Sequence, residues 1–370
     1  MTKIPYAMAI GNWLPYSETF IYDQVKHAER YTPYVIARGL NPARENFPYN
    51  HVTSLGAVER MLYYAALPCG KFIDVIHQND IRFIHAHFGT NGALVAATAR
   101  KTDKPLIVTL HGVDVGILLN PHIPIDYLFY KRTYKKMFET AQLLLPASQE
   151  LADCLIQLGA PESKIHVHRL GVDTSAFTPF TRPDRPANFL MIGRQVEKKG
   201  FEYGIRAFAK IAGKHAGSTL TLIGKGPLQE SLQALAAECG IQDKVIFKGS
   251  IPSKQMPALL ENYDVLVAPC IVAKNNDRDS GLIVLKEAGA SAMASIGTYC
   301  GGLPEIIDDS KTGYLVGQRD VDKLAESMDA LASDYSLRTQ MGIAARAKME
   351  AEYDTVTQNK KLEGLFDQFA

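Results

Sequence analysis

Short apolar runs alternate with amphipathic stretches along the whole chain. Two series of apolar runs predict strands, and stretches with helical spacing, such as residues 201–214 and 228–239, lie between them. Alternation of almost continuous apolar strands with helices predicts parallel sheets covered on both faces. The predicted strands are residues 6–10, 34–38, 83–88, 106–111, 143–147 and 165–170, then 189–193, 219–224, 245–248, 265–269, 295–298 and 314–316.

The alternation pauses once, at residues 178–187, where three prolines and three charged residues interrupt the periodicity. We interpret this segment as a linker between an N-terminal domain, residues 1–178, and a C-terminal domain, residues 179–354. The fold class predicted is α/β, with two Rossmann-like doubly wound domains that face each other across a cleft. Residues 355–370 form a helical pattern whose position suggests packing back on the N-terminal domain.

Composition excludes several classes of protein. The 370 residues are 46% hydrophobic and 21% charged, which is typical of a globular chain and not of a disordered one. A net charge of +1 gives no whole-chain signal for nucleic acid. Five irregularly spaced cysteines without a CxxC pair favour neither a disulfide framework nor zinc, and a reducing cytoplasm is the simplest interpretation. The first apolar run is too short for a signal peptide, and we expect any membrane contact to be peripheral.

A basic turn follows the first strand of the second series, with the sequence G-R-Q-V-E-K-K-G over residues 193–200. Arg194 and Lys199 lie five residues apart just before a helix. Cations beside a helix N-terminus form an anion site, and arginine can grip a diphosphate through two parallel hydrogen bonds. A solvated basic turn explains the same residues equally well.

Two further motifs lie at strand ends. Gly224 opens the turn G-K-G-P-L, which lets a phosphate approach the backbone, although an ordinary turn would also explain it. Asp279 precedes a helix that contains Glu287, with Gly281 and Leu282 at its start. Buried carboxylates need donors such as sugar or ribose hydroxyls, and free N–H groups at the helix start suit a phosphate. The alternative is an N-capping aspartate with a surface glutamate.

Taken together, these motifs resemble those of family-4 retaining glycosyltransferases of GT-B fold, also described as glycosyl transferases group 1. That family carries G-R-x(2–3)-K-G, then G-x-G-P-L, E-x7-E and G-G-x-P-E; the last matches residues 301–305 here. The first acid of E-x7-E is Asp279 in this chain, a form similar to the colanic-acid and exopolysaccharide subset. The resemblance implies that Arg194 and Lys199 bind the diphosphate, Glu287 the ribose, and Asp279 the donor sugar.

The N-terminal half resembles the same subset. S-E-T-F-I at residues 17–21 is similar to its S-E-T-F-[IV] signature, although Ser17 and Glu18 are also typical of a helix start. The segments H-A-H-F-G, residues 85–89, and V-T-L-H-G-V-D, residues 108–114, resemble its H-x-H and T-x-H-G-x-D segments. The resemblance implies that His111 faces the donor sugar and that Gly11 lies near the donor phosphate. Without it, a lone histidine at a strand end is usually structural.

The expected site therefore has His111, Asp279, Arg194 and Lys199 as catalytic residues. Donor-binding residues are expected to be Gly11, Arg194, Lys199, Gly224, Gly281, Leu282 and Glu287. We expect no metal and no cofactor beyond the UDP- or GDP-sugar donor, because the two cations can neutralise the phosphates. A metal at the D-x-D pair formed by Asp277 and Asp279 is the alternative.

Residues 124–140 mix aromatic residues with four cations on a predicted helix. Such a helix can lie on an anionic bilayer surface, or it can be a core helix with a solvated basic side. The sequence thus predicts a metal-independent hexosyltransferase of the cytoplasm or of the inner membrane face. Its acceptor would be a glycan or a lipid-linked sugar in exopolysaccharide biosynthesis. The alternatives are a GT-B-like sugar-nucleotide epimerase and a non-catalytic sugar-nucleotide-binding protein.

Overall fold

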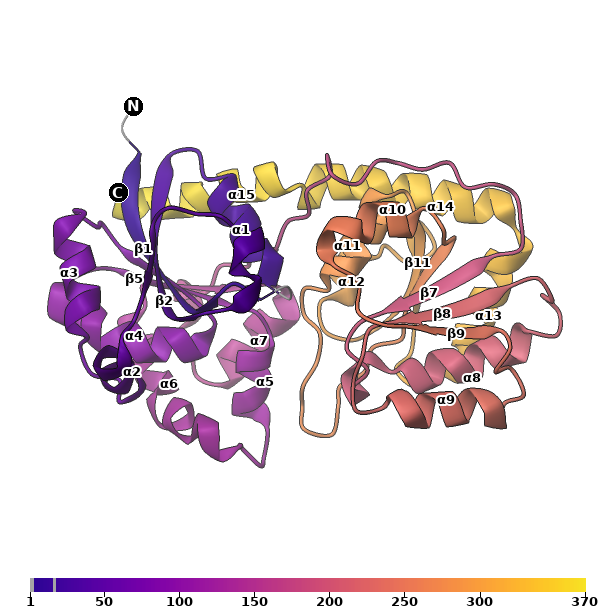
Figure 1. Cartoon of the computed structure of the whole chain (residues 1–370), viewed down its shortest axis with the longest axis horizontal. Coiled ribbons are helices and arrows are strands. Elements are labelled where there is room, and N and C mark those ends of the chain that lie inside the picture. Colours follow the sequence, from indigo (N-terminus) through magenta and orange to yellow (C-terminus); the bar gives the residue numbers. More distant parts are fainter. Residues whose placement is uncertain (1–2, 16–17) are drawn as a thin grey trace. The chain divides into compact units, whose positions relative to one another are not determined.

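The computed structural model describes residues 3–15 and 18–370. The chain divides into two compact units, each built on its own six-stranded sheet (Figure 1). Unit 1 comprises Met1–Gly171 together with Thr355–Ala370, and unit 2 comprises Val172–Asp354. All strand pairs in both sheets are parallel, as the apolar runs predicted.

The sheet of unit 1 has the strand order β3-β2-β1-β4-β5-β6. The order reverses direction between β1 and β4, which is the point where doubly wound sheets bind ligands beyond the carboxyl ends of their strands. Its strands are β1 (Ile4–Trp13), β2 (Tyr31–Leu40), β3 (Val52–Ser54), β4 (Ile84–His87), β5 (Leu106–Leu110) and β6 (Leu143–Pro146).

Helices cover both faces of this sheet, and the side chains of β1 alternate between two cores. Ala7 and Ala9 pack on one face, while Met8 and Ile10 pack on the other. This period of two is what a strand buried on both sides requires. The helices of unit 1 are α1 (Thr19–Lys26), α2 (Ala57–Tyr64), α3 (Gly70–Gln78), α4 (Gly89–Thr102), α5 (Val113–Leu119), α6 (Leu128–Thr140), α7 (Gln149–Gln157) and α15 (Thr355–Phe366).

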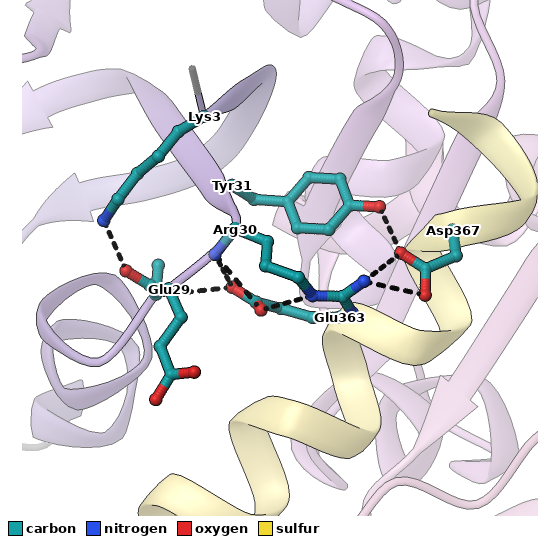
Figure 2. A network of polar contacts seen from close by, with 7 residues as sticks. Lys3, Glu29, Arg30, Tyr31, Glu363 and Asp367 are labelled. Atoms are coloured by element: carbon teal, nitrogen blue, oxygen red, sulfur yellow. Dashed lines mark hydrogen bonds and ion pairs between the residues drawn. The ribbon is translucent and has the colours of Figure 1, made fainter. Parts of the chain in front are cut away.

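The last helix, α15, is held on unit 1 by both apolar and ionic contacts. Phe366 lies with its ring centre 4.8 Å from that of Phe83. Figure 2 shows the polar contacts at the start of β2: the Glu363 carboxylate accepts hydrogen bonds from the Arg30 backbone N–H (3.1 Å) and side chain (3.3 Å). Asp367 accepts from Arg30 and from the Tyr31 hydroxyl, each at 2.8 Å. Unit 1 is thereby completed by a helix that follows unit 2 in the sequence.

Unit 2 repeats the same topology, with the strand order β12-β11-β10-β7-β8-β9. Here the order reverses between β7 and β10. Phe189 and Met191 point into one core and Leu190 into the other. The strands are β7 (Asn188–Ile192), β8 (Thr219–Ile223), β9 (Val245–Lys248), β10 (Val265–Ala268), β11 (Ala294–Thr298) and β12 (Gly313–Val316). The helices are α8 (Phe201–Ile211), α9 (Gln229–Glu238), α10 (Met256–Leu260), α11 (Ile283–Ala290), α12 (Leu303–Ile306), α13 (Val321–Ser333) and α14 (Tyr335–Lys348).

The structure differs from the sequence interpretation around the boundary. The division falls between Gly171 and Val172, seven residues before the interpreted end of the N-terminal domain. Phe177 packs in a core of unit 2, and Arg182 is buried and donates to the carbonyl oxygen of Tyr263 at 2.6 Å. Residues 178–187 thus belong to unit 2, where Arg182 anchors them, although most of them are exposed.

The strand predicted at residues 165–170 was wrong, because its pairing with β6 is limited to one isolated bridge between Leu144 and Ile165. The segment nevertheless runs along β6: the N–H groups of His166 and His168 donate to carbonyl oxygens of that strand at 3.0 and 2.9 Å.

Candidate active site

The basic turn after β7 is held close to the sheet. Gly193 has a φ of +152°, and the short 3₁₀ helix Glu197–Lys199 follows it. The side chain of Lys199 is only 12% exposed, whereas Arg194 is exposed. Lys199 is therefore a fixed cation, while Arg194 is free to move toward a ligand.

Lys199 is paired with the acid that the sequence placed before α11. Its Nζ lies 2.8 Å from Asp279 Oδ2, and the side chain of Asp279 is 14% exposed. Burial alone would raise the pKa of Asp279, but Lys199 and Lys198 outweigh it and hold that pKa below its usual value. Burial likewise opposes the charge of Lys199, yet Asp279 raises its pKa. Both groups are thus charged near neutral pH.

Lys198 forms a second ion pair in the same cluster. Its Nζ lies 3.0 Å from Asp277 and 3.5 Å from Asp279. The two carboxylates of the D-x-D sequence are thus neutralised by lysines. Across residues 3–15 and 18–370, no three His, Cys, Asp or Glu side chains group in a way that could hold a metal ion.

The glycine turns bring backbone close to backbone around this cluster. At Gly224, where φ is +123°, an added Cβ would lie 2.1 Å from the carbonyl oxygen of Gly193. At Gly301, where φ is +55°, it would lie 1.8 Å from the carbonyl oxygen of Asp279. Neither approach admits a side chain, so glycine at these two positions fixes the separation of the loops.

Helix α11 begins at Ile283, directly after Gly281 and Leu282. Leu282 is its N-cap and provides no side-chain cap. Among the eight residues of the helix, only Ile283 and Glu287 are partly exposed. Because they are four residues apart, Ile283 and Glu287 share one face of the helix.

Strand order explains why the predicted residues of unit 2 come together. β10, β7 and β8 are neighbours, and parallel strands present their carboxyl ends at one edge. Gly193 and Arg194 follow β7, Gly224 follows β8, and Asp279 follows β10. Gly11 and His111 belong to unit 1.

In unit 1, the turn after β5 carries His111 and is fixed by Asp114. The buried Asp114 carboxylate accepts hydrogen bonds from the backbone N–H groups of Gly89 (2.7 Å), Gly112 (2.9 Å) and His111 (3.2 Å). Burial raises the pKa of Asp114, and these N–H groups oppose the rise. One carboxylate therefore ties the end of β4 to the end of β5.

Three histidines lie beside one another at these strand ends. His87 Nδ1 is 3.1 Å from His111 Nε2, and the His85 and His87 ring centres are 4.5 Å apart. Burial, followed by His168, lowers the pKa of His87 to about 3. Burial, followed by His87 and His168, lowers the pKa of His111 well below its usual value. All three rings are neutral at pH 7, since burial also lowers the pKa of His85.

Phe88, which directly follows His87, has a φ of +68°, which is rare for an aromatic residue. Its ring centre lies 4.5 Å from that of His111. Such backbone strain is concentrated at functional sites in proteins.

Gly11 lies inside β1, two residues before its end at Trp13. An added Cβ there would lie 3.0 Å from the guanidinium of Arg38 on β2. Ser17 of the S-E-T-F-I signature lies outside the described residues. Its neighbour Glu18 is described, and burial raises the pKa of Glu18 to about 7 against the pull of Arg38.

The predicted basic helix is α6 with the short turn before it. Tyr130, Tyr134, Met137 and Phe138 are buried in unit 1, whereas the four cations, Lys131, Arg132, Lys135 and Lys136, are exposed. Ile125 and Leu128 at its start are 80% and 41% exposed. In the part of the chain that is described, no helix combines the length and apolar character needed to cross a bilayer.

Sequence reasoning missed Lys198, Asp114 and His87 as functional candidates. The sequence shows two adjacent lysines at residues 198–199, but the aspartates with which they pair lie about eighty residues later. Asp114 is one residue of the T-x-H-G-x-D segment, and its role is evident only from the two strand ends that it joins. His87 was read as structural because nothing in the sequence indicates its contact with His111.

Comparison with known proteins connects both units to one group of enzymes. Residues 174–348 match the family described as Glycosyl transferases group 1, and residues 17–176 match Glycosyltransferase Family 4. WcaL of Escherichia coli strain K12, named as a colanic acid biosynthesis glycosyltransferase, is 30% identical over 318 residues, covering 84% of this chain and 75% of WcaL. The amylovoran biosynthesis glycosyltransferase AmsK of Erwinia amylovora is 28% identical and covers 77% of this chain and 69% of AmsK.

A solved structure shows the same fold over the full length. HepE of Anabaena, crystallised in complex with UDP, superposes with a TM-score of 0.80 at 18% identity, covering 99% of this chain and 100% of HepE. Sucrose-phosphate synthase from Thermosynechococcus elongatus gives a TM-score of 0.78, also at 18% identity, with 99% of each chain covered. The predicted GT-B fold is confirmed.

Proposed function

Because this chain belongs to the group 1, family 4 glycosyltransferases, as its ordered motifs predicted, we propose that it transfers a sugar from a nucleoside diphosphate sugar to an acceptor hydroxyl with retention of configuration. The names of WcaL and AmsK support a role in exopolysaccharide biosynthesis, with a glycan or a lipid-linked sugar as acceptor. The complex of HepE with UDP supports a nucleotide donor. The observation that carries the proposal is the cationic cluster at the β7–β10 switch point of unit 2.

Each residue has a role that follows from its chemistry. Arg194 and Lys199 stabilise the charge that develops on the leaving diphosphate. Glu287 accepts hydrogen bonds from the ribose hydroxyls, because it carries the one carboxylate of α11 and is partly exposed. The N–H groups of Gly281 and Leu282, at the start of α11, donate to phosphate oxygens.

The remaining roles concern the sugar. Asp279 contacts the donor sugar once the diphosphate engages Lys199, and Gly224 admits the nucleotide to the backbone. His111 stabilises the donor sugar at the reaction centre, and Gly11 leaves space for the phosphate beside its strand.

Transfer requires no metal in this proposal. Lys198 and Lys199 already neutralise Asp277 and Asp279, and Arg194 supplies a further positive charge for the diphosphate. Turnover should be unchanged by 5 mM EDTA, roughly a saturating excess over trace metal. A loss of turnover that Mg²⁺ or Mn²⁺ restores would contradict this part of the proposal.

Calorimetry against a panel of UDP- and GDP-sugars tests the donor assignment. One nucleotide sugar should bind, and Arg194→Ala should weaken its binding by about tenfold or more, because a charged hydrogen-bond donor is lost. Arg206→Ala is the matched control, since Arg206 is an exposed arginine on the adjacent helix α8. Failure of every nucleotide sugar to bind would refute the proposal. Unchanged binding in Arg194→Ala would favour a non-catalytic binding protein.

The proposed location is the cytoplasm at the inner face of the membrane, with α6 and the turn before it as the contact. Exposed Ile125 and Leu128 adjoin the exposed cations Lys131 and Arg132, which is the composition of a segment that binds anionic lipid. Sedimentation with phosphatidylglycerol vesicles should pull down the protein, and vesicles of phosphatidylcholine should not. The double variant Ile125→Asp, Lys131→Glu should no longer sediment with the phosphatidylglycerol vesicles. Equal sedimentation of this variant would refute the contact.

A further inference from the structure

His87 connects His111 to a small buried cavity in unit 1. His87 is 1% exposed, and its ring lies nearly parallel to that of His111, with an interplanar angle of 9°. Their nitrogens Nδ1 and Nε2 are 3.1 Å apart. Because both rings are neutral, one of these two nitrogens donates and the other accepts. The tautomer of His87 therefore decides which nitrogen of His111 carries a proton.

The cavity lies among α1, the end of β4 and the start of α15. It has a volume of about 20 Å³ and is lined by His87, Gln24 and Thr355, among others. His87 Nε2, Gln24 Nε2 and Thr355 Oγ1 are buried and have no hydrogen-bond partner among the described residues. A polar cavity of this volume accommodates one water molecule, and a buried water typically makes about three hydrogen bonds. The three atoms are the number of partners that such a water requires.

We propose that His87 is a positioning residue for His111, and that a water bound between Gln24, Thr355 and His87 selects its tautomer. The Gln24 amide donates at Nε2, so the water accepts there, and we assign its two hydrogens to His87 Nε2 and Thr355 Oγ1. His87 then carries its proton on Nδ1 and donates it to His111 Nε2. His111 consequently carries its own proton on Nδ1.

This inference deepens the proposed function and rests on it in one respect. His111 then has one fixed hydrogen-bonding pattern, in which Nε2 accepts from His87 and the buried Nδ1 carries the proton. The ring that the proposed function places beside the donor sugar is thereby held in a single tautomer. The water site thus pre-organises unit 1 for the sugar before any substrate binds.

Nuclear magnetic resonance tests the tautomer directly. In the full chain labelled with ¹⁵N-histidine, long-range ¹H–¹⁵N correlations report the protonated nitrogen of each ring, and the His111→Gln spectrum assigns His111. We expect His111 to be protonated on Nδ1 in the unmodified chain, and Gln24→Met to produce a mixture of tautomers. Gln78→Met, at an exposed position in α3, is the matched control and should leave the spectrum unchanged. An Nε2-protonated His111, or one that Gln24→Met does not alter, would overturn the inference.

Turnover tests the consequence. His87→Phe keeps an aromatic ring at this position but removes both ring nitrogens. It should lower kcat by at least about tenfold while the donor KM changes by less than about twofold. His87→Asn places an amide nitrogen where Nδ1 was and should restore most of the loss. Equal impairment of both variants would overturn the positioning role. If His87→Phe does not fold, Gln24→Met carries the same kcat test.

The failure of the two ideas can be told apart. If His111→Ala retains full turnover, the proposed role of His111 fails, and the tautomer measurement still decides the inference about His87. If His111→Ala is inactive, but Gln24→Met leaves the tautomer of His111 as it is in the unmodified chain, the positioning inference fails alone.

Discussion

The pair formed by Lys199 and Asp279 combines a structural and a functional role, and Lys199→Met separates them. Methionine keeps the length of the side chain and removes its charge. Removing one partner of a buried ion pair destabilises a protein by about 3–5 kcal/mol, because the other charge is left uncompensated. Lys198 remains 3.5 Å from Asp279 and offsets part of this loss. We expect the free energy of unfolding to fall by about 2–3 kcal/mol.

Nucleotide binding should fall independently of stability. A hydrogen bond from a charged group contributes about 1.5–3 kcal/mol, so the Kd for UDP or GDP should rise about 10- to 150-fold in Lys199→Met. The double variant Lys199→Met with Asp279→Asn should recover most of the lost stability, since no buried charge is left unpaired. It should still bind the nucleotide weakly, because the cation is missing.

Urea unfolding and calorimetry on the same samples check both effects. Lys210→Met is the matched control, because Lys210 forms an exposed ion pair with Asp322, and exposed pairs contribute little to stability. The reasoning is refuted if Lys199→Met loses stability but binds UDP and GDP as tightly as the unmodified chain. Lys199 would then serve the fold alone.

Three further predictions concern the loops. Gly224→Ala should lower the free energy of unfolding by about 2 kcal/mol or more and weaken nucleotide binding, because its Cβ would lie 2.1 Å from the Gly193 carbonyl oxygen. Gly213→Ala is the control, since its Cβ would meet nothing within 4 Å, and thermal unfolding compares the two variants. Asp114→Asn replaces a carboxylate that accepts backbone N–H groups and should destabilise unit 1 by about 1–3 kcal/mol in urea; a loss below 0.5 kcal/mol, roughly the scatter of surface substitutions, would contradict this. The pKa of Asp279 lies below its usual value, so its pairing stabilises the fold above about pH 4 and this contribution is lost as pH falls through the lowered pKa. Asp279→Asn should therefore lose less stability than the unmodified chain on acidification, and equal losses in urea would contradict the pairing.

The strand-end residues of unit 2 could be predicted from the sequence because of a general property of parallel sheets. Arg194, Gly224 and Asp279 each follow an apolar run, and the carboxyl ends of parallel strands lie at one edge. Nothing about loop conformation is needed to bring them into one region. The order of the motifs along the chain then indicated the family and the roles of these residues.

The contacts within the site could not be predicted, since they depend on loop conformation. The pairing of Lys199 with Asp279 joins residues eighty positions apart. Arg182 is an even clearer case: its charge and the neighbouring prolines indicated a solvated linker. Its guanidinium instead donates to carbonyl oxygens of unit 2, among them those of Tyr263 and Ala292, and carbonyl groups leave no signal in a sequence.

The discontinuity of unit 1 has a consequence for how the chain acquires its fold during synthesis. Unit 2 is continuous in sequence from Val172 to Asp354, so the ribosome releases all of its residues before unit 1 receives α15. Until then, the aromatic surface around Phe83 lacks its cover from Phe366. The half of the protein that is translated first is therefore completed last, and in that interval its exposed apolar face is the part of the nascent chain most in need of a chaperone.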